Sequence, residues 1–339
     1  MYGLVAIWTS LETTVLQTFG PTAAYGAPAL GGALAFSALY YAGRRRERGR
    51  RASIRGFVRS VFAPRIILHP SSFVDMKLWT LNAIVLASAY GMLGWGLFYW
   101  RDRVGSGLTR VLGAHAPTPL SAWIVLTIAT VLQLLAYELA YWLAHYAFHK
   151  IPALWEFHKV HHSAEVLTTL TELRQHPVEI LAFVNLIGLS TGLVFGVMTY
   201  VFGPGVQPFT LLNGNILLMM FLLTYGHLRH SHMWIAFTGT VGRILQSPAH
   251  HQIHHSDDPR HFDKNLGYSL ALWDWAFGTL AIPSRMREPI TFGVGEESSR
   301  FHSTIGSCLW PAARSGAHLA RHFRRPSAPT ATPVAPPPR

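Results

Sequence analysis

Residues 123–150, WIVLTIATVLQLLAYELAYWLAHYAFHK, form an apolar run that ends in two histidines. About 20 predominantly apolar residues are enough for a helix to cross a bilayer, and this run is longer than that. We therefore expect a transmembrane helix whose last turns project beyond the hydrocarbon. His145 and His149 lie in the projecting end, four residues apart and so on one face of the helix.

The same criterion of length and apolarity predicts five membrane spans. They are residues 24–43, 78–100, 120–148, 178–202 and 209–226. The composition agrees, because half of the 339 residues are hydrophobic and only 13% are charged. The predicted fold class is all-α, a polytopic transmembrane helical protein.

An arginine-rich loop sets the expected orientation. RRRERGRR, residues 44–51, follows the first expected span, and Arg55, Arg59 and Arg65 follow it. The positive-inside rule makes this loop cytoplasmic, and counting spans from it returns the chain to the cytoplasm before every dense histidine stretch. The formal net charge of +12 is then explained by orientation and anionic lipid headgroups, and we expect no nucleic-acid partner.

Three regions are expected along the chain. Residues 1–77 hold an N-terminal membrane segment and the basic loop, residues 78–285 the transmembrane and catalytic domain, and residues 286–339 a basic tail whose Pro- and Ala-rich end is expected to be disordered. The first residues lack a basic segment before their apolar residues, so no cleavable secretory signal is expected. The single cysteine, Cys308, excludes an intramolecular disulfide.

Clustered histidines carry the chemistry. HKVHH (158–162) and HHQIHH (250–255) each contain an HxxHH triplet, and HLRHSH (227–232) follows the fifth expected span. Imidazole is a ligand for iron and zinc, and helical positions i, i+3 and i+4 bring three rings to one side. One tetrahedral zinc uses at most four protein ligands, so nine or ten convergent histidines favour two metal ions. The candidate ligands are His145, His149, His158, His161, His162, His227, His230, His251, His254 and His255.

These motifs resemble those of the fatty acid hydroxylase and sterol desaturase superfamily. HxxxH, HxxHH and a later HxxHH are interleaved with expected transmembrane segments. RQHPVE, residues 174–179, resembles the RxHPxE segment of that family. SPAHHQIHHSDDPRHFDKNLG, residues 247–267, is followed by WDWAFGTL, as in sterol desaturase relatives. The resemblance covers roughly residues 120–280.

The resemblance implies a helical cap on the cytoplasmic face that holds two iron ions. It selects His251 rather than His250 as the first ligand of the last motif, and it implies no catalytic residue separate from the ligands. Glu138 is expected to hold the ring N–H of a liganding histidine. His176 and Asn265 are expected to support the ligands from behind.

The implied reaction is the O2-dependent hydroxylation, or desaturation, of a lipid C–H bond. No flavin or dinucleotide fingerprint is visible, so electrons are expected from a separate donor, such as a cytochrome b5-like protein, a ferredoxin or a reductase. Two other classes remain open. A zinc hydrolase is disfavoured because HExxH is missing, and a metal transporter is disfavoured because its ligands would lie nearer the membrane centre.

Overall fold

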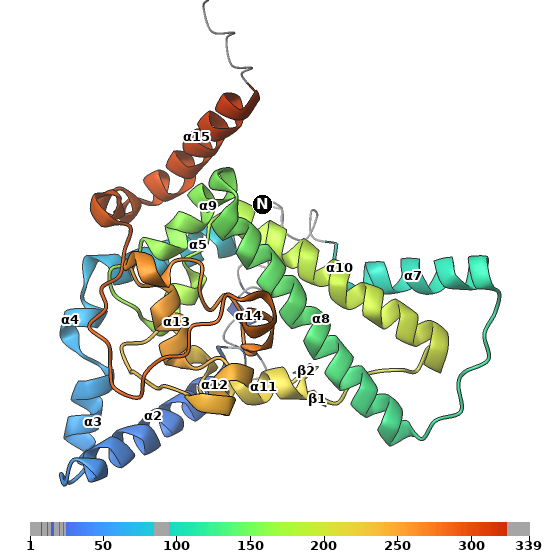
Figure 1. The fold of residues 1–339 in the computed structure, drawn as a ribbon, viewed down its shortest axis with the longest axis horizontal. Helices are drawn as coiled ribbons and strands as arrows, with labels where there is room; N and C mark the ends of the chain where they lie inside the picture. Colours follow the sequence, from blue (N-terminus) through green and yellow to red (C-terminus); the bar gives the residue numbers. More distant parts are fainter. Residues whose placement is uncertain are drawn as a thin grey trace, which may run out of the picture.

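A computed structural model of the protein describes residues 25–84 and 95–323, together with positions 8, 12, 15, 16, 20 and 23. Among these residues the fold is almost entirely helical (Figure 1). The strands β1 (Thr210–Leu211) and β2 (Gly214–Asn215) form one short antiparallel hairpin. The predicted all-α class is confirmed, whereas the three predicted regions stay a prediction.

Two long helices form the frame. α8 (Ala122–Lys150) and α10 (Pro177–Phe202) pack against each other, and they are the two helices of the described residues that are long and apolar enough to cross a membrane. The expected spans 120–148 and 178–202 are therefore confirmed as helices. α10 begins at Pro177, and His176 caps it by accepting a hydrogen bond from the backbone N–H of Val178.

α7 (Leu97–Leu112) lies against α10 along a row of glycines. A Cβ atom added to Gly192 would lie 2.4 Å from the Cβ of Trp100, and one added to Gly196 would lie 2.5 Å from the Cβ of Val104. No larger side chain fits there without moving one of the helices. Such close approach over small residues is typical of helix pairs in membranes.

The other three expected spans differ in the structure. α2 (Ala27–Glu47) is long enough, but its last turn carries three arginines and it is not among the candidate membrane helices. Of the expected span 78–100, residues 85–94 lie outside the described part of the chain, with α5 (Pro70–Ile84) before them and α7 after them.

The expected span 209–226 is wrong. Leu212 and Asn213 both have positive φ angles, of 48° and 65°, and they form the two-residue loop of the β1–β2 hairpin. α11 (Ile216–Leu222) follows with only seven residues, which is about 10 Å of helix against a hydrocarbon thickness of about 30 Å. The tight turn interrupts an apolar run that is otherwise long enough to cross.

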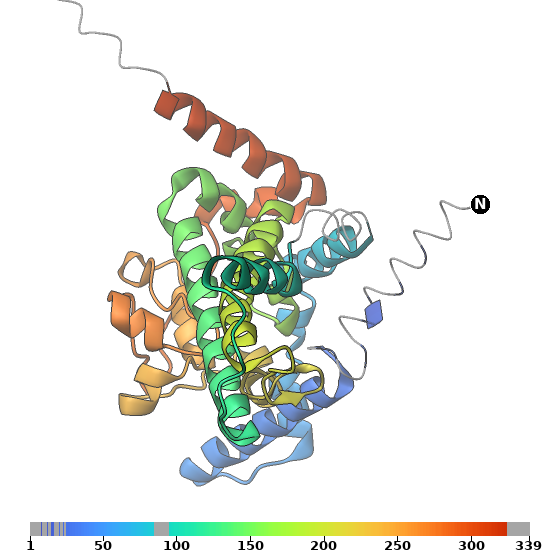
Figure 2. The same cartoon turned by 90° about the vertical axis from the view of Figure 1, so that its right-hand side faces the viewer.

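A helical cap covers the end of α8 that carries the histidines (Figure 1). α9 (Pro152–His162) turns back directly after α8, and α14 (Leu272–Phe277) contacts α8. α13 (Pro248–His254) reaches the same part of α8, because the rings of His254 and His145 lie 4.5 Å apart between centroids. Figure 2 shows α15 lying across this end of the molecule, where it contacts α9. The remaining elements are α3 (Ile54–Val61), α4 (Pro64–Ile67), η1 (Thr169–Leu173), η2 (Gly226–Leu228), α12 (Gly239–Ile244), η3 (Pro259–His261), η4 (Gly295–His302) and α15 (Thr304–Phe323).

Candidate metal centre

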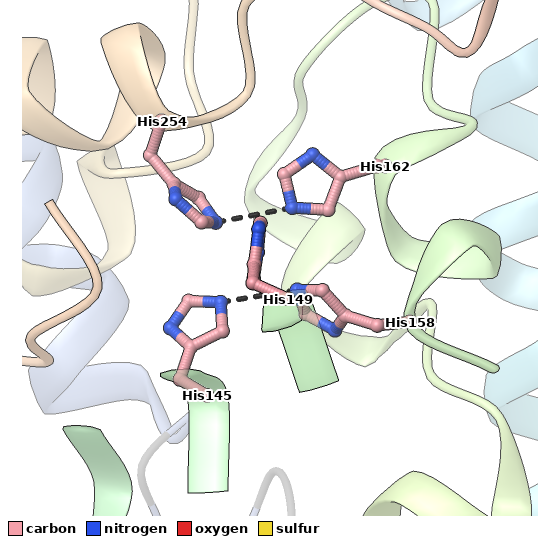
Figure 3. A group of neighbouring side chains, drawn as sticks. All are labelled: His145, His149, His158, His162 and His254. Carbon is pink, nitrogen blue, oxygen red and sulfur yellow. Dashed lines mark hydrogen bonds between the residues drawn. The ribbon is translucent and has the colours of Figure 1, made fainter. Parts of the chain in front are cut away.

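Five histidines from α8, α9 and α13 converge beneath the cap. Figure 3 shows their rings pointing toward one another from separate elements. They are His145, His149, His158, His162 and His254, and one ring nitrogen of each lies within 4.8 Å of the others. The Nε2 atoms of His145 and His158 are 3.0 Å apart. Those of His162 and His254 are 3.1 Å apart. We call this set the first histidine group.

Four further histidines form a second histidine group. They are His161, His230, His251 and His255. The Nε2 atom of His230 lies 2.8 Å from that of His251, 3.1 Å from that of His255 and 3.2 Å from that of His161. All four side chains are buried. The second group therefore combines His230 with one histidine of α9 and two histidines of the α13 motif.

Each HxxHH motif divides its histidines between the two groups. In α9, His158 and His162 join the first group, and His161 joins the second. In the later motif, His254 joins the first group, and His251 and His255 join the second. The rings of His162 and His255 stack with their centroids 4.6 Å apart, so the two groups are neighbours.

The nitrogen positions fit metal cations. Two Nε2 lone pairs that face each other at about 3 Å repel unless a proton or a cation lies between them. Metal–imidazole bonds are about 2.0–2.1 Å long, so adjacent nitrogens around one octahedral ion lie about 3 Å apart. The separations of 2.8–3.2 Å match that spacing. Each group is thus a donor set of the kind that a transition metal requires.

In the first group, Nδ1 faces an oxygen acceptor in four of the five rings. An acceptor at Nδ1 holds the ring proton there and leaves the Nε2 lone pair for a metal. The four contacts are His145 to the Leu266 carbonyl at 2.7 Å, His158 to Glu179 at 2.8 Å, His254 to the Lys264 carbonyl at 2.9 Å and His149 to Asp263 at 3.3 Å.

The second group instead has a buried cation beside it. Nη2 of Arg229 lies 3.0 Å from Nδ1 of His251, and the guanidinium covers the ring of Tyr268 at 4.5 Å. Arg229 is 1% exposed, and its Nε and Nη1 atoms have no hydrogen-bond partner among the described residues. The electrostatic surroundings of the two groups are therefore opposite, with carboxylates behind the first and a guanidinium behind the second.

Burial sets the protonation state of the histidines that lie outside α8. Desolvation lowers the pKa of His161 to about 3, because the charged imidazolium loses its hydration. The same cause lowers the pKa of six other grouped histidines well below its ordinary value, namely His158, His162, His230, His251, His254 and His255. The rings are neutral near pH 7, which is the form that binds metals.

Nine of the ten histidines predicted as ligands lie in the two groups. The exception is His227, which lies outside both and whose ring packs against Tyr25 with 4.5 Å between centroids. His250 accepts a hydrogen bond from the N–H of Ser247 and donates one to the Gly242 carbonyl, so it caps α13 and is not part of either group. His251 lies in the second group, whereas the choice of His251 rather than His250 as a ligand stays a prediction.

Glu138 holds a loop and not a histidine. Its carboxylate accepts hydrogen bonds from the backbone N–H groups of Ser269 and Leu270 and from the Ser269 hydroxyl. Glu138 lies seven residues, almost two helical turns, before His145, which places its carboxylate too far along the helix to reach that ring. Glu138 therefore supports His145 indirectly. It holds the loop that contains Leu266, and the Leu266 carbonyl accepts a hydrogen bond from His145.

The other two expected supporting residues also have structural contacts. Nε2 of His176 donates to the Cys308 carbonyl, which joins the start of α10 to α15. Asn265 has a positive φ of 56° and donates to the carbonyls of His250 and Ala281. It therefore fixes the segment that follows α13.

Sequence reasoning missed several supporting groups. Glu179 and Arg174 lie within the quoted RQHPVE segment, but nothing in that segment indicates which histidine they serve. Arg174 is fully buried and donates to the carbonyl of Val160 and to the hydroxyl of Ser163. It therefore fixes the end of α9 that carries three of the histidines. Asp274, within WDWAFGTL, accepts from the Leu266 and Gly267 N–H groups and holds the same loop as Glu138.

Two cavities approach the histidines from different sides. One, of about 650 Å³, is lined by His149, His162 and His254 of the first group. The other, of about 920 Å³, lies among α7, α8, α10 and the hairpin and reaches Phe183. The Phe183 ring is 5.1 Å from Tyr141, which in turn is 5.5 Å from His145, so one layer of rings separates this cavity from the first group.

Comparison with known proteins gives one family. Residues 130–279 match the model described as "Fatty acid hydroxylase". Alkylglycerol monooxygenase of Danio rerio is 29% identical over 150 residues, which are 44% of this chain and 30% of that protein. The Homo sapiens protein of the same name is 26% identical over 167 residues, 49% of this chain and 33% of that protein. Ornithine lipid hydroxylase OlsE of Rhizobium tropici is 26% identical over 186 residues, 55% of this chain and 51% of that protein.

The matched region spans a third to a half of the length of these relatives. No solved structure matches. The family match contains all nine grouped histidines. The predicted resemblance is confirmed.

Proposed function

We propose that the chain, whose residues 130–279 match the fatty acid hydroxylase model, hydroxylates a lipid C–H bond with O2 at a two-iron centre. The proposed ligands are the nine grouped histidines: His145, His149, His158, His162 and His254 for one iron, and His161, His230, His251 and His255 for the other.

The division of both HxxHH motifs between the two groups carries this proposal. A single ion needs only one converging set, whereas here consecutive histidines alternate between two sets that touch through stacked rings. Nine nitrogen donors exceed the three or four that a zinc site takes. An all-nitrogen donor set suits iron. These features favour an oxygenase over a zinc hydrolase or a metal transporter.

The bound irons would activate O2 with two electrons from the separate donor, and the C–H bond would supply the other two, with the balance C–H + O2 + 2 e⁻ + 2 H⁺ → C–OH + H2O. The protein's own part is to hold the ligands and to exclude water. Glu179 and Asp263 keep the ring protons of His158 and His149 on Nδ1. The aromatic layer of Tyr141 and Phe183 covers the membrane side of the first group.

We propose a membrane lipid with a polar headgroup as the substrate class. The names of the relatives support this class, because one set acts on alkylglycerols and another protein on ornithine lipids. The mainly apolar cavity of about 920 Å³ beside α8 and α10 has room for part of an aliphatic chain. The cavity reaches Phe183, so an aliphatic chain bound there would be separated from the first histidine group by the rings of Phe183 and Tyr141.

We further propose that α8 and α10 cross the membrane in a multi-pass protein whose histidines face the cytoplasm. Arg44, at the basic end of α2, lines one pocket together with Trp234, which packs against α13 of the cap. The arginines that indicate the cytoplasmic side and the cap are therefore neighbours. Electrons would come from a separate donor, and residues 78–285 would form the catalytic domain.

The test is oxygen-isotope lipidomics combined with metal analysis. Cells that express the wild-type chain under ¹⁸O2 should accumulate a lipid that is heavier by one ¹⁸O atom, and the purified protein should contain about two irons. His161→Ala should abolish the product, whereas His115→Ala, which changes an exposed histidine far from both groups, should not. Unchanged lipids, or one zinc per chain, would contradict the proposal.

A further inference from the structure

An arginine-lined pocket lies at the C-terminal end of α2, apart from both histidine groups. Its volume is about 630 Å³. Six arginines line it, and no aspartate or glutamate of the described residues does so: Arg44, Arg45, Arg48, Arg59, Arg65 and Arg287. So many like charges around one hollow repel one another unless an anion is bound.

The pocket is assembled from distant parts of the chain. Three of the arginines come from the end of α2 and two from α3 and α4, whereas Arg287 follows α14. The Tyr40 hydroxyl donates to the Trp234 carbonyl, and Nε2 of His232 donates to the Ser60 carbonyl. These two bonds join α2 and α3 to the segment that follows His230, so the pocket is a built feature of the fold.

Most of the pocket's positive charge is not neutralised by the protein. Of the six arginines, only Arg44 has an ion-pair partner in the described part of the chain, Glu47 at 2.8 Å. Arg45 donates to a backbone carbonyl, that of Arg51. Guanidinium groups bind phosphate oxygens in pairs through their planar N–H groups, so the arrangement suits a phosphate.

The orientation role of these arginines does not account for the pocket. Membrane orientation depends on how many Lys and Arg residues lie near the ends of the spans, and not on whether they converge. Arg46, Arg50 and Arg55 belong to the same loop and would serve orientation equally well, yet they do not line the pocket. Arg287 also lines the pocket, although it follows α14 and does not belong to that loop.

An apolar groove adjoins the arginine pocket. It has a volume of about 280 Å³, and α2 and the α3–α4 segment line it with Leu30, Leu34 and Phe62 among others. His232 and Met233 line both the groove and the pocket, so the two are contiguous. A site with a cationic end and an apolar end has the chemistry of an amphiphile with an anionic head.

The surface around the pocket also suits a bilayer interface. Ile54 is 84% exposed and Leu68 is 66% exposed, and both lie among the arginines of α3 and α4. Segments that combine exposed apolar residues with basic ones lie at the boundary of headgroups and acyl chains, where anionic lipids attract them.

We propose that the pocket and groove bind one anionic phospholipid of the cytoplasmic leaflet, with its phosphate among the arginines and the first part of an acyl chain in the groove. No histidine of either group lines the pocket or the groove, so this lipid is distinct from the substrate at the metal centre. It would hold α2, α3 and α4 to the segment after His230 and so anchor the cap at the membrane surface.

Lipid binding to the purified full-length protein tests the proposal. Native mass spectrometry should show one phosphatidylglycerol retained per chain, and phosphatidylcholine should be lost at lower collision energy. Glycerol 3-phosphate, which has the phosphate but no chain, should bind at least about tenfold more weakly than the lipid, because it buries no apolar surface.

Matched variants separate the pocket from general charge. Arg48→Gln/Arg59→Gln/Arg65→Gln should weaken phosphatidylglycerol binding by about tenfold or more, as expected for the loss of charge-assisted hydrogen bonds. The control triple Arg46→Gln/Arg50→Gln/Arg55→Gln removes the same charge from the same loop and should change the affinity by less than about twofold. Arg287→Gln alone should also weaken phosphatidylglycerol binding, although Arg287 lies far along the sequence from the other five arginines. The metal content of each variant confirms that it is folded.

Four outcomes would overturn the proposal. Equal losses in both triples would mean diffuse electrostatic attraction. Equal affinity for glycerol 3-phosphate would assign the pocket to a soluble phosphate compound, and equal retention of phosphatidylcholine would remove the role of the anion. Unchanged lipid binding in the pocket triple, with loss of binding to an acidic ferredoxin, would assign the pocket to a redox protein.

Discussion

Glu179, in the first turn of α10, accepts a hydrogen bond from Nδ1 of His158 in α9 across 2.8 Å, and both side chains are buried. This contact joins a helix proposed to cross the membrane directly to the first histidine group. A carboxylate behind an imidazole fixes its tautomer and raises its basicity as a ligand.

Removal of this carboxylate should weaken metal binding at the first group. We expect Glu179→Ala to lower metal affinity about 10- to 100-fold, because Nδ1 of His158 loses its acceptor and the ring loses its orientation. The measurement is the metal content of purified protein after dialysis against graded chelator. Asp102→Ala, at an exposed position of α7 that does not line the cavity at the first histidine group, is the control and should bind metal like the wild type. Equal metal retention in both variants would refute the role of Glu179.

The guanidinium of Arg229 should raise the reduction potential of an iron held by the second group. A nearby positive charge favours the ferrous over the ferric state, and Arg229 contacts His251 at 3.0 Å while it is 1% exposed. Arg229→Gln should lower the midpoint potential of that iron by on the order of 60 mV, which corresponds to about 1.4 kcal/mol for one electron. Redox titration followed by EPR gives the value. Arg229→Lys keeps the charge and should shift the potential less, so an equal shift in both variants would point to altered geometry.

The histidine motifs were predictable because their information is local. The spacing of His158, His161 and His162 on one helix, repeated later in the chain, is enough to indicate ligands that converge. The spans of α8 and α10 were predictable from length and apolarity alone.

Long-range contacts were not predictable. Glu138 meets Ser269 across 131 positions of the chain, and no spacing rule connects the two. The effect of Arg229 on the second histidine group depends on its contact with His251, which lies 22 positions later in α13. The fifth expected span failed for a local reason instead, since Leu212 and Asn213 turn the chain where hydropathy alone predicts continuation.

Acid should release the metal and destabilise the fold together. An unfolded histidine has a pKa of about 6.5, whereas burial lowers the pKa of His161 to about 3 and lowers that of its neighbours. Between these values the unfolded chain binds more protons than the folded one. The free energy of unfolding is therefore highest above about pH 6.5. It falls as the pH drops from there through the folded pKa of these histidines.

Each histidine that remains neutral in the fold contributes a slope of about 1.4 kcal/mol per pH unit within that window. Thermal unfolding and metal content measured from pH 8 to pH 4 should both stay constant down to about pH 6.5 and then decline. Stability that is independent of pH below 6 would mean that the rings are not buried in the neutral form.

Glycine substitutions in α10 and α7 should have opposite signs. A Cβ on Gly192 would lie 2.4 Å from Trp100 Cβ and 2.7 Å from the Leu97 carbonyl oxygen, so Gly192→Ala must push α7 away from α10. We expect a loss of about 1–3 kcal/mol, the usual cost of overpacking. Gly107 lies in α7 with nothing within 4 Å of its added Cβ. Gly107→Ala should stabilise by about 0.5–1 kcal/mol, because alanine loses less backbone entropy in a helix. Thermal unfolding in detergent compares the two variants, and stabilisation by Gly192→Ala would mean that α7 and α10 are not in contact at Gly192.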